Sequence, residues 1–145
     1  MSSVDIAAGR DSHRSHDVTA PRVLLAEDDQ EMRRMLAATL RKDGCDVVEV
    51  CDGRELLQWL TANRLKNGPD EGLDLLISDV RLPGHGGLDV LAGMRWADWR
   101  VPVVLITGFA DAATHAEARR LGASALFDKP FDLDDFRTIV WNLLW

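Results

Sequence analysis

The residues of this sequence that could do chemistry are three acids, a hydroxyl and an amine, each placed close behind a short apolar run. They are Glu27, Asp28, Asp79, Thr107 and Lys129. Carboxylates that lie within a few ångströms of one another repel, and a divalent cation compensates that repulsion. Magnesium prefers oxygen ligands, among them carboxylates and the oxygens of substrate phosphates. The set therefore indicates a magnesium site that handles phosphoryl groups.

One of the acids is placed to react covalently. A carboxylate can act as the nucleophile in phosphoryl transfer and form an aspartyl phosphate. Such transfer depends mainly on positioning and on neutralising charge. We expect Asp79 to attack, the Lys129 ammonium and the Thr107 hydroxyl each to contact one phosphoryl oxygen, and the cation to hold a third.

These residues need a scaffold that brings distant parts of the chain together. From Pro21 onward, short apolar runs alternate with segments of helical period, which predicts an α/β fold with a parallel sheet and crossover helices. Ligands bind at the carboxyl edge of such a sheet. The predicted strands are 23–26, 47–50, 73–77, 103–106 and 125–127, and apolar residues three or four apart predict helices around 32–40, 56–60, 88–94, 112–121 and 133–144.

Length and composition indicate a single domain preceded by a tail. The chain has 145 residues, of which 46% are hydrophobic, and this is enough for one core. Residues 1–20 lack periodicity and apolar surface, so we interpret them as a flexible N-terminal tail and 21–145 as the domain. Asp29 is expected to cap the first helix rather than to bind metal.

Charge and hydropathy exclude some functions. The net charge of −7 argues against direct nucleic-acid binding. No apolar stretch approaches the roughly 20 residues that span a bilayer, and no secretory signal opens the chain, so we expect no membrane association and a cytoplasmic location. Cys45 and Cys51 flank a predicted strand and are expected to remain unbridged.

At this point the sequence resembles the receiver domains of bacterial response regulators, from Arg22 to the C-terminus. The matching stretches are Leu-Leu-Ala-Glu-Asp-Asp at 24–29, Leu-Ile-Ser-Asp-Val-Arg-Leu-Pro-Gly at 76–84, Val-Leu-Ile-Thr-Gly at 104–108 and Phe-Asp-Lys-Pro-Phe at 127–131. The resemblance implies a flavodoxin-like doubly wound (βα)5 parallel sheet with strand order 2-1-3-4-5. It also implies two-component phosphorelay signalling rather than an enzyme with a free substrate.

The resemblance assigns a role to each site residue. Asp79 would be the phosphoacceptor, with Thr107 and Lys129 contacting the phosphoryl group and with intrinsic autodephosphorylation able to remove it. Mg²⁺ would be held by Glu27, Asp28, Asp79 and the backbone carbonyl of Arg81. The phosphoryl donor would be a sensor histidine kinase or a histidine phosphotransfer protein. The peptide bond between Lys129 and Pro130 is expected to be cis.

The sequence departs from the family pattern at positions that affect the step after phosphorylation. Leu126 stands where an aromatic residue normally turns inward, and Phe127 should point to the other face of the sheet. Arg81 and Phe109 stand two residues beyond Asp79 and Thr107, where side chains can screen the hydrolytic water. We therefore expect a bulky Phe109 to slow the loss of phosphate.

The output of the domain is left open by the sequence. The chain stops at Trp145, so the protein is either a stand-alone receiver or a fragment. It could signal to a protein partner or form a homodimer through the face made by the fourth helix, fifth strand and fifth helix. Trp141 and Trp145 either anchor such a partner or fold against the domain's own edge.

Other functional classes fit less well. A phosphatase of the haloacid dehalogenase type needs a second acid two residues after the nucleophile, where this chain has Arg81. A flavin binder needs a Ser/Thr/Gly-rich phosphate cradle, which the loops do not offer. The stronger alternative is a receiver-fold interaction module that works without phosphorylation.

Overall fold

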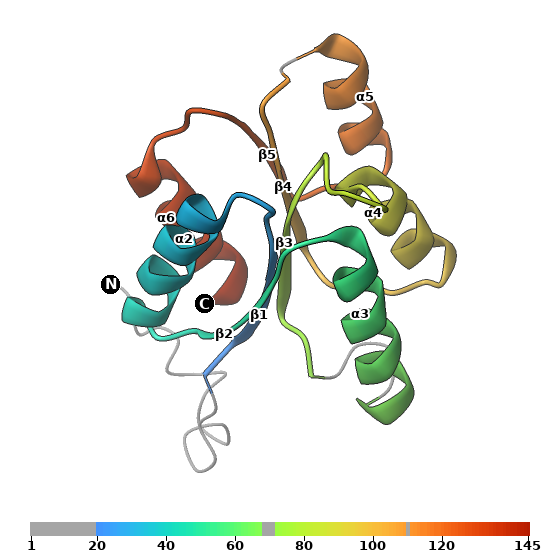
Figure 1. Cartoon of the computed structure of the whole chain (residues 1–145), viewed down its shortest axis with the longest axis horizontal. Coiled ribbons are helices and arrows are strands. Elements are labelled where there is room, and N and C mark those ends of the chain that lie inside the picture. Colours follow the sequence, from blue (N-terminus) through green and yellow to red (C-terminus); the bar gives the residue numbers. More distant parts are fainter. Residues whose placement is uncertain (1–19, 68–71, 110) are drawn as a thin grey trace.

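Apolar runs that must be covered on both faces determine the architecture, a parallel sheet between two layers of helices (Figure 1). The structure is a computed structural model that describes residues 20–67, 72–109 and 111–145. The predicted flexible tail lies outside the described residues except for Ala20. No helix in these described ranges is long and apolar enough to cross a membrane.

The sheet has the predicted doubly wound topology. Its five strands are parallel and lie in the order β2-β1-β3-β4-β5. They are β1 Arg22–Ala26, β2 Asp46–Val50, β3 Leu75–Asp79, β4 Val103–Thr107 and β5 Ala125–Asp128. Our prediction placed the third strand too early, because Leu73 is buried beside the sheet but lies before the paired segment. Apolar patterning reports burial and does not report pairing.

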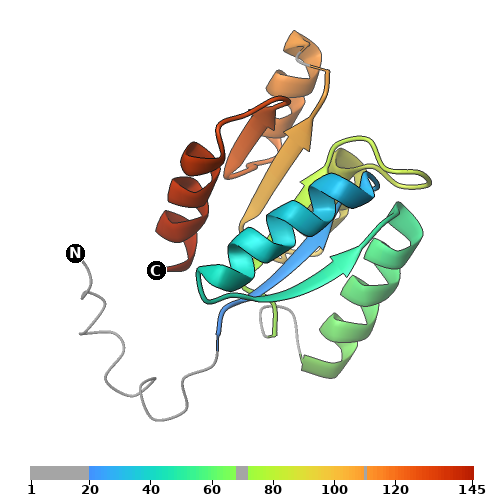
Figure 2. The ribbon, with the colours of Figure 1, turned by 60° about the vertical axis from the view of Figure 1, so that its left-hand side comes forward.

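The helices divide between the two faces of the sheet. They are α2 Gln30–Lys42, α3 Gly53–Asn67, α4 Gly87–Trp96, α5 Ala112–Arg120 and α6 Leu133–Leu144. Figures 1 and 2 show α2 and α6 on one face and α3, α4 and α5 on the other. This arrangement confirms the (βα)5 prediction.

Strand alternation supplies each helical layer with its own core. Leu24, Leu76 and Leu105 point toward α3 and α4, whereas Leu25 and Ile77 point toward α2 and α6. The inner strands β3 and β4 are buried along their whole length. Opposite faces of one strand thus hold the two helical layers in register.

Local signals set the helix ends. The Asp29 carboxylate accepts hydrogen bonds from the backbone N–H groups of Glu31 and Met32 at 3.0 and 3.2 Å, which confirms Asp29 as the cap of α2. Asp132 caps α6 in the same way. Gly44 ends the first helical segment at a φ of 103°, a conformation that side chains disfavour.

Two tryptophans at the C-terminal end of α6 stack on one another. The ring centroids of Trp141 and Trp145 are 4.3 Å apart, and the side chains stay 48% and 36% exposed. Both cysteines are free, as expected from their places around β2. The tryptophan pair is therefore partly exposed and partly covered.

A glycine lets α3 begin in contact with the loop that follows β3. The N–H of Gly53 donates to the Pro83 carbonyl at 2.9 Å. A Cβ atom at Gly53 would lie 2.2 Å from the backbone nitrogen of His85. The start of α3 and this loop can only pack this closely because the side chain is missing.

Gly53→Ala should destabilise the domain by about 1–3 kcal/mol, because the new methyl group forces the loop backbone away. This outweighs the gain of roughly 0.5–1 kcal/mol that alanine brings to a helix. The free energy of unfolding in urea measures the effect. Gly108→Ala is the control, since a Cβ there meets no described atom within 4 Å; equal effects of the two changes would contradict the prediction.

Candidate functional site

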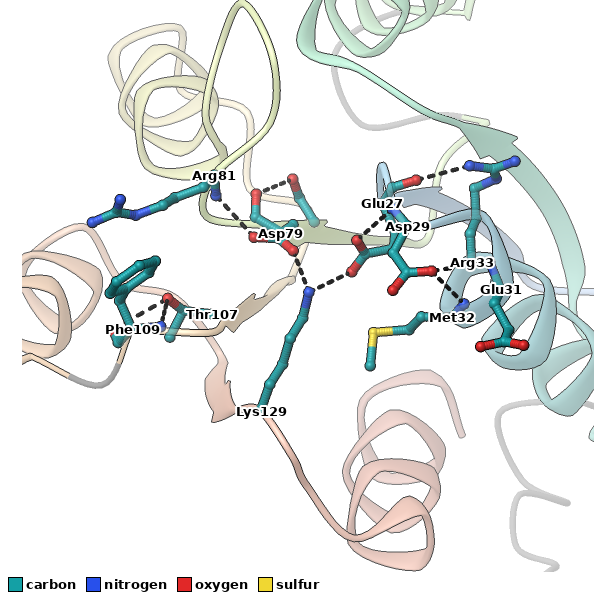
Figure 3. Close-up of polar contacts among 11 residues, drawn as sticks. Glu27, Asp29, Glu31, Met32, Arg33, Asp79, Arg81, Thr107, Phe109 and Lys129 are labelled. Atoms are coloured by element: carbon teal, nitrogen blue, oxygen red, sulfur yellow. Dashed lines mark hydrogen bonds and ion pairs between the residues drawn. The ribbon is translucent and has the colours of Figure 1, made fainter.

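Parallel pairing brings the predicted site residues to one edge of the sheet. Asp79, the last residue of β3, pairs with Ile106, and Thr107, the last residue of β4, pairs with Asp128. Lys129 follows directly, and Glu27 follows β1. Figure 3 shows Glu27, Asp79, Thr107 and Lys129 at this edge.

The centre of the site is an ammonium between two buried carboxylates. Lys129 Nζ donates a hydrogen bond to Asp79 Oδ2 at 2.6 Å and lies 3.0 Å from Glu27 Oε1 (Figure 3). Asp79 is 4% exposed and Glu27 is fully buried. Burial opposes the charge of Lys129, but the bonds to Asp79 and Glu27 outweigh it and hold the pKa of the amine above its usual value.

The backbone aims the two carboxylates. The N–H of Asp29 donates to Glu27 Oε2 at 3.0 Å, and the N–H of Arg81 donates to Asp79 Oδ1 at 2.9 Å. A Cβ at Gly87 would lie 2.7 Å from the Asp79 carbonyl oxygen, so α4 needs glycine at its start to approach β3. The Asp79 carboxylate is thus held at Oδ1 by the Arg81 N–H and at Oδ2 by Lys129.

The two oxygens of the buried Glu27 carboxyl have different partners. Oε2 accepts the Asp29 N–H, and Oε1 lies 3.0 Å from Lys129 Nζ in an ion pair. Burial raises the pKa of the Glu27 carboxyl to about 7, with Asp79 adding to the shift and the Asp29 N–H and Lys129 opposing it. A bound cation would offset both the free-energy cost of burying the charged Glu27 carboxyl and its repulsion by Asp79.

The acidic residues fit a divalent cation. Glu27, Asp28 and Asp79 each offer an oxygen, and these oxygens lie within 4.8 Å of one another. Three carboxylates face one ammonium, and an all-oxygen set suits Mg²⁺. The Arg81 carbonyl, predicted from the resemblance as a further ligand, stays a prediction; the structure shows only its N–H engaged with Asp79.

Thr107 is at the site but its hydroxyl is occupied elsewhere. The hydroxyl accepts the N–H of Phe109 at 3.0 Å and donates to the Phe109 carbonyl at 3.2 Å (Figure 3). Thr107 is fully buried. Contact with a phosphoryl oxygen, as predicted, would require the hydroxyl to leave this turn.

Arg81 and Phe109 form a contact that the sequence analysis did not foresee. The Arg81 guanidinium carbon lies 3.9 Å from the centroid of the Phe109 ring, which itself is 56% exposed. The signal was present in the spacing. Each residue stands two positions beyond the end of a strand, and those strands, β3 and β4, are neighbours.

The two sides of β5 carry different residues, as predicted. Phe127 packs against Phe131 and Phe136, with ring centroids 5.4 and 5.7 Å apart. Leu126 lies on the other face, where it lines a cavity of about 230 Å³ with His115. His115 Nε2 is 3.0 Å from Asp128 Oδ1, a link between α5 and β5 that sequence reasoning missed.

The peptide bond between Lys129 and Pro130 is cis, as the resemblance implied. With it, every sequence-predicted site residue is located. Glu27, Asp28, Asp79 and Lys129 come together in one cluster, with the Arg81 N–H on Asp79 and the Thr107 hydroxyl turned to Phe109. A doubly wound sheet with an acidic, lysine-containing cluster at its carboxyl edge defines a phosphoryl-handling α/β domain.

Comparisons with known proteins give the family. The family model of the response regulator receiver domain matches residues 23–141. The chain belongs to this family. It is thereby a receiver domain of two-component phosphorelay signalling, a class of phosphoacceptors that bind Mg²⁺ at their acidic site and interact with histidine kinases or phosphotransfer proteins.

Individual relatives differ in how much of their length the chain covers. Regulatory protein AtoC of Escherichia coli (strain K12) is 33% identical over 123 residues, which are 85% of this chain and 25% of AtoC. Sporulation initiation phosphotransferase F of Bacillus subtilis (strain 168) is 28% identical over 123 residues, which are 93% of that protein. The chain thus spans a quarter of one relative and nearly all of the other.

Solved structures share the fold. The chemotaxis response regulator CheY4 of Vibrio cholerae superposes with a TM-score of 0.73 at 26% identity, over 87% of this chain and 100% of that chain. The receiver domain of a LuxO repressor protein from Vibrio parahaemolyticus gives a TM-score of 0.75 at 27% identity, over 87% of this chain and 91% of that chain. These matches agree with the predicted topology.

Magnesium should stabilise the metal-free protein through the acidic cluster. At a concentration ten times the Kd, the free energy of unfolding should rise by about 1.4 kcal/mol. Asp28→Asn should reduce this rise, because the substitution removes one carboxylate. Thermal unfolding during a magnesium titration measures both.

Asp29→Asn is the matched control for this experiment. Asparagine also caps helices well, so α2 keeps its cap while the chain loses one acid next to the site. This variant should respond to magnesium as the wild type does. An unchanged response in Asp28→Asn, or none in the wild type, would contradict the assignment.

Proposed function

We propose that this domain accepts a phosphoryl group on Asp79 in a magnesium-dependent phosphorelay step and signals by a change of conformation. The single observation behind the proposal is the cluster in which Lys129 Nζ lies 2.6 Å from Asp79 and 3.0 Å from buried Glu27. A nucleophilic carboxylate, an ammonium and further acidic oxygens able to hold a cation are the components that such a transfer uses.

The transfer can be written with atoms and charges in balance. An oxygen of Asp79 forms a bond to phosphorus as the bond between phosphorus and an imidazole nitrogen of the donor breaks. The imidazole keeps the electron pair and takes a proton from solvent. Lys129 neutralises one phosphoryl oxygen, and the Thr107 hydroxyl turns from Phe109 to another. Glu27, Asp28, Asp79 and the Arg81 carbonyl would hold a magnesium ion, which would supply further charge neutralisation.

The donor is a sensor histidine kinase or a histidine phosphotransfer protein, and the location is cytoplasmic. The name of sporulation initiation phosphotransferase F, a relative covered over 93% of its length, supports a relay role. The domain is a phosphoacceptor and not a turnover enzyme. The face formed by α5, β5 and α6 carries the response to a partner protein or a second copy.

Incubation with magnesium and acetyl phosphate should add the mass of one phosphoryl group to the intact protein. Asp79→Asn should show no gain. Asp128→Asn should gain as the wild type does, because Asp128 ends β5, which β4 separates from β3, and it contacts His115 instead of the site. Intact-protein mass spectrometry reads all three.

A wild type that gains no mass from either small donors or kinases would favour the alternative, an interaction module that works without phosphorylation. A gain that persists in Asp79→Asn would place the phosphoryl group on another residue. Either outcome contradicts the proposal.

The exposed ring of Phe109 stacks on Arg81, and each residue stands two positions beyond the last residue of its strand at the carboxyl edge of the sheet. We propose that the Phe109 ring slows hydrolysis of the aspartyl phosphate by screening water. Phe109→Ala should speed phosphate loss roughly tenfold, equivalent to about 1.4 kcal/mol of barrier. The decay of the phosphorylated mass with time measures it.

Phe109→Leu is the control, since leucine keeps a bulky apolar side chain at this position and should retain most of the slow decay. If Phe109→Ala leaves the decay unchanged, the screening role is wrong.

A further inference from the structure

A groove on the outer surface between α3 and α4 has no role in phosphoryl chemistry. It encloses about 310 Å³ and has an apolar floor. Leu60, Val90, Met94 and Trp99 contribute buried side chains to it. A cavity of this volume is large enough for a bulky side chain or a small ligand.

The far end of the groove is held in place by an arginine. Arg64 on α3 donates to the Ala97 carbonyl at 3.0 Å, and its guanidinium lies 5.5 Å from the centroid of the Trp99 ring. This bridge joins the end of α3 to the segment that follows α4. The groove is therefore a preformed feature of the surface.

The exposed ridge of α4 beside the groove, formed by Asp89, Ala92, Gly93 and Trp96, has no large side chain at its middle. Gly93 is exposed, and a Cβ built there would meet no described atom within 4 Å. Ala92 and Asp89 are also exposed and lie on the same side of the helix. A partner surface can therefore approach the α4 backbone closely.

The most exposed large apolar side chain of the described structure stands on this ridge. Trp96 is 92% exposed and lies one turn beyond Gly93. At 100° per residue, the groove-lining positions Val90 and Met94 fall on one flank of Gly93 and Trp96 on the other. One surface patch thus carries an aromatic projection and an apolar recess side by side.

We propose that this patch joins two copies of the chain, with Trp96 of each copy seated in the α3–α4 groove of the other. A two-fold axis that passes between Trp96 and the groove brings Trp96 of each copy to the groove of the other. One operation then fills both recesses at once, as an isologous interface requires. The inference is independent of phosphorylation at Asp79.

The lining of the groove suits an indole in polarity. The indole N–H is a donor only. The rim offers the Asp89 carboxylate and the Thr61 hydroxyl as acceptors, while the floor is apolar. Two tryptophans bury about 150–250 Å² each and cover a similar area of the grooves, which stays below the roughly 1,200 Å² of standard specific interfaces, so the dimer is weak and depends on concentration.

Sedimentation velocity of the full chain without phosphodonor, over a wide concentration range, tests the proposal. The wild type should shift from monomer to dimer as concentration rises. Trp96→Ala should weaken dimerisation at least roughly 30-fold, as expected for a central aromatic anchor. Because Trp96 is exposed, this variant should unfold as the wild type does.

Two further variants test the groove and the specificity of the effect for Trp96. Gly93→Leu places a side chain over the groove mouth, where the monomer has space, and should also weaken the dimer. Trp141→Ala removes another exposed tryptophan, on α6, and should leave dimerisation unchanged.

Three results would overturn the proposal. They are a wild type that stays monomeric at the highest concentration, a dimer that survives both Trp96→Ala and Gly93→Leu, and equal weakening by Trp96→Ala and Trp141→Ala.

Discussion

The site depends on an imbalance of charge that the fold enforces. Glu27 and Asp79 are buried at the ends of adjacent strands, and Asp28 stands beside them. Lys129 is the ammonium that meets them both, at 2.6 and 3.0 Å. Buried like charges cost free energy unless they are compensated. Three carboxylates face only one ammonium, so the cluster favours the binding of a divalent cation. The cation and Lys129 together can then neutralise the negative oxygens of a phosphoryl group.

The scaffold tolerates this imbalance because the surrounding structure is tightly constrained. β3 and β4 are buried along their length, and the carboxylates are held by backbone N–H groups that cannot rotate away. Glycines 53 and 87 allow α3 and α4 to approach the site loops more closely than any side chain would permit. Stability in the core thus offsets the cost of the acidic edge.

Much of this could be predicted from the sequence, since burial on both faces produces continuous apolar runs and the ends of those runs carried the polar residues. The strand order needed the family resemblance. Leu73 misled the strand assignment because burial does not require pairing. The hydrogen bonds of Thr107 to Phe109 were not predictable from spacing, because a threonine hydroxyl can rotate to several partners. The contact of Arg81 with Phe109 depends on side-chain conformations that strand register permits but does not specify.

The position of Thr107 bears on how a phosphorylated site could influence the rest of the domain. If its hydroxyl turns to a phosphoryl oxygen, it gives up both hydrogen bonds to Phe109, and the segment before α5 loses an anchor. That segment also carries the ring stacked on Arg81 and leads to Asp111, the cap of α5. On the other side, α5 is tied to β5 by His115 and Asp128, over a cavity lined by Leu126 in place of an aromatic side chain. A movement of the Phe109 segment would therefore reach α5 through its N-terminus, without an aromatic residue that rotates beneath it.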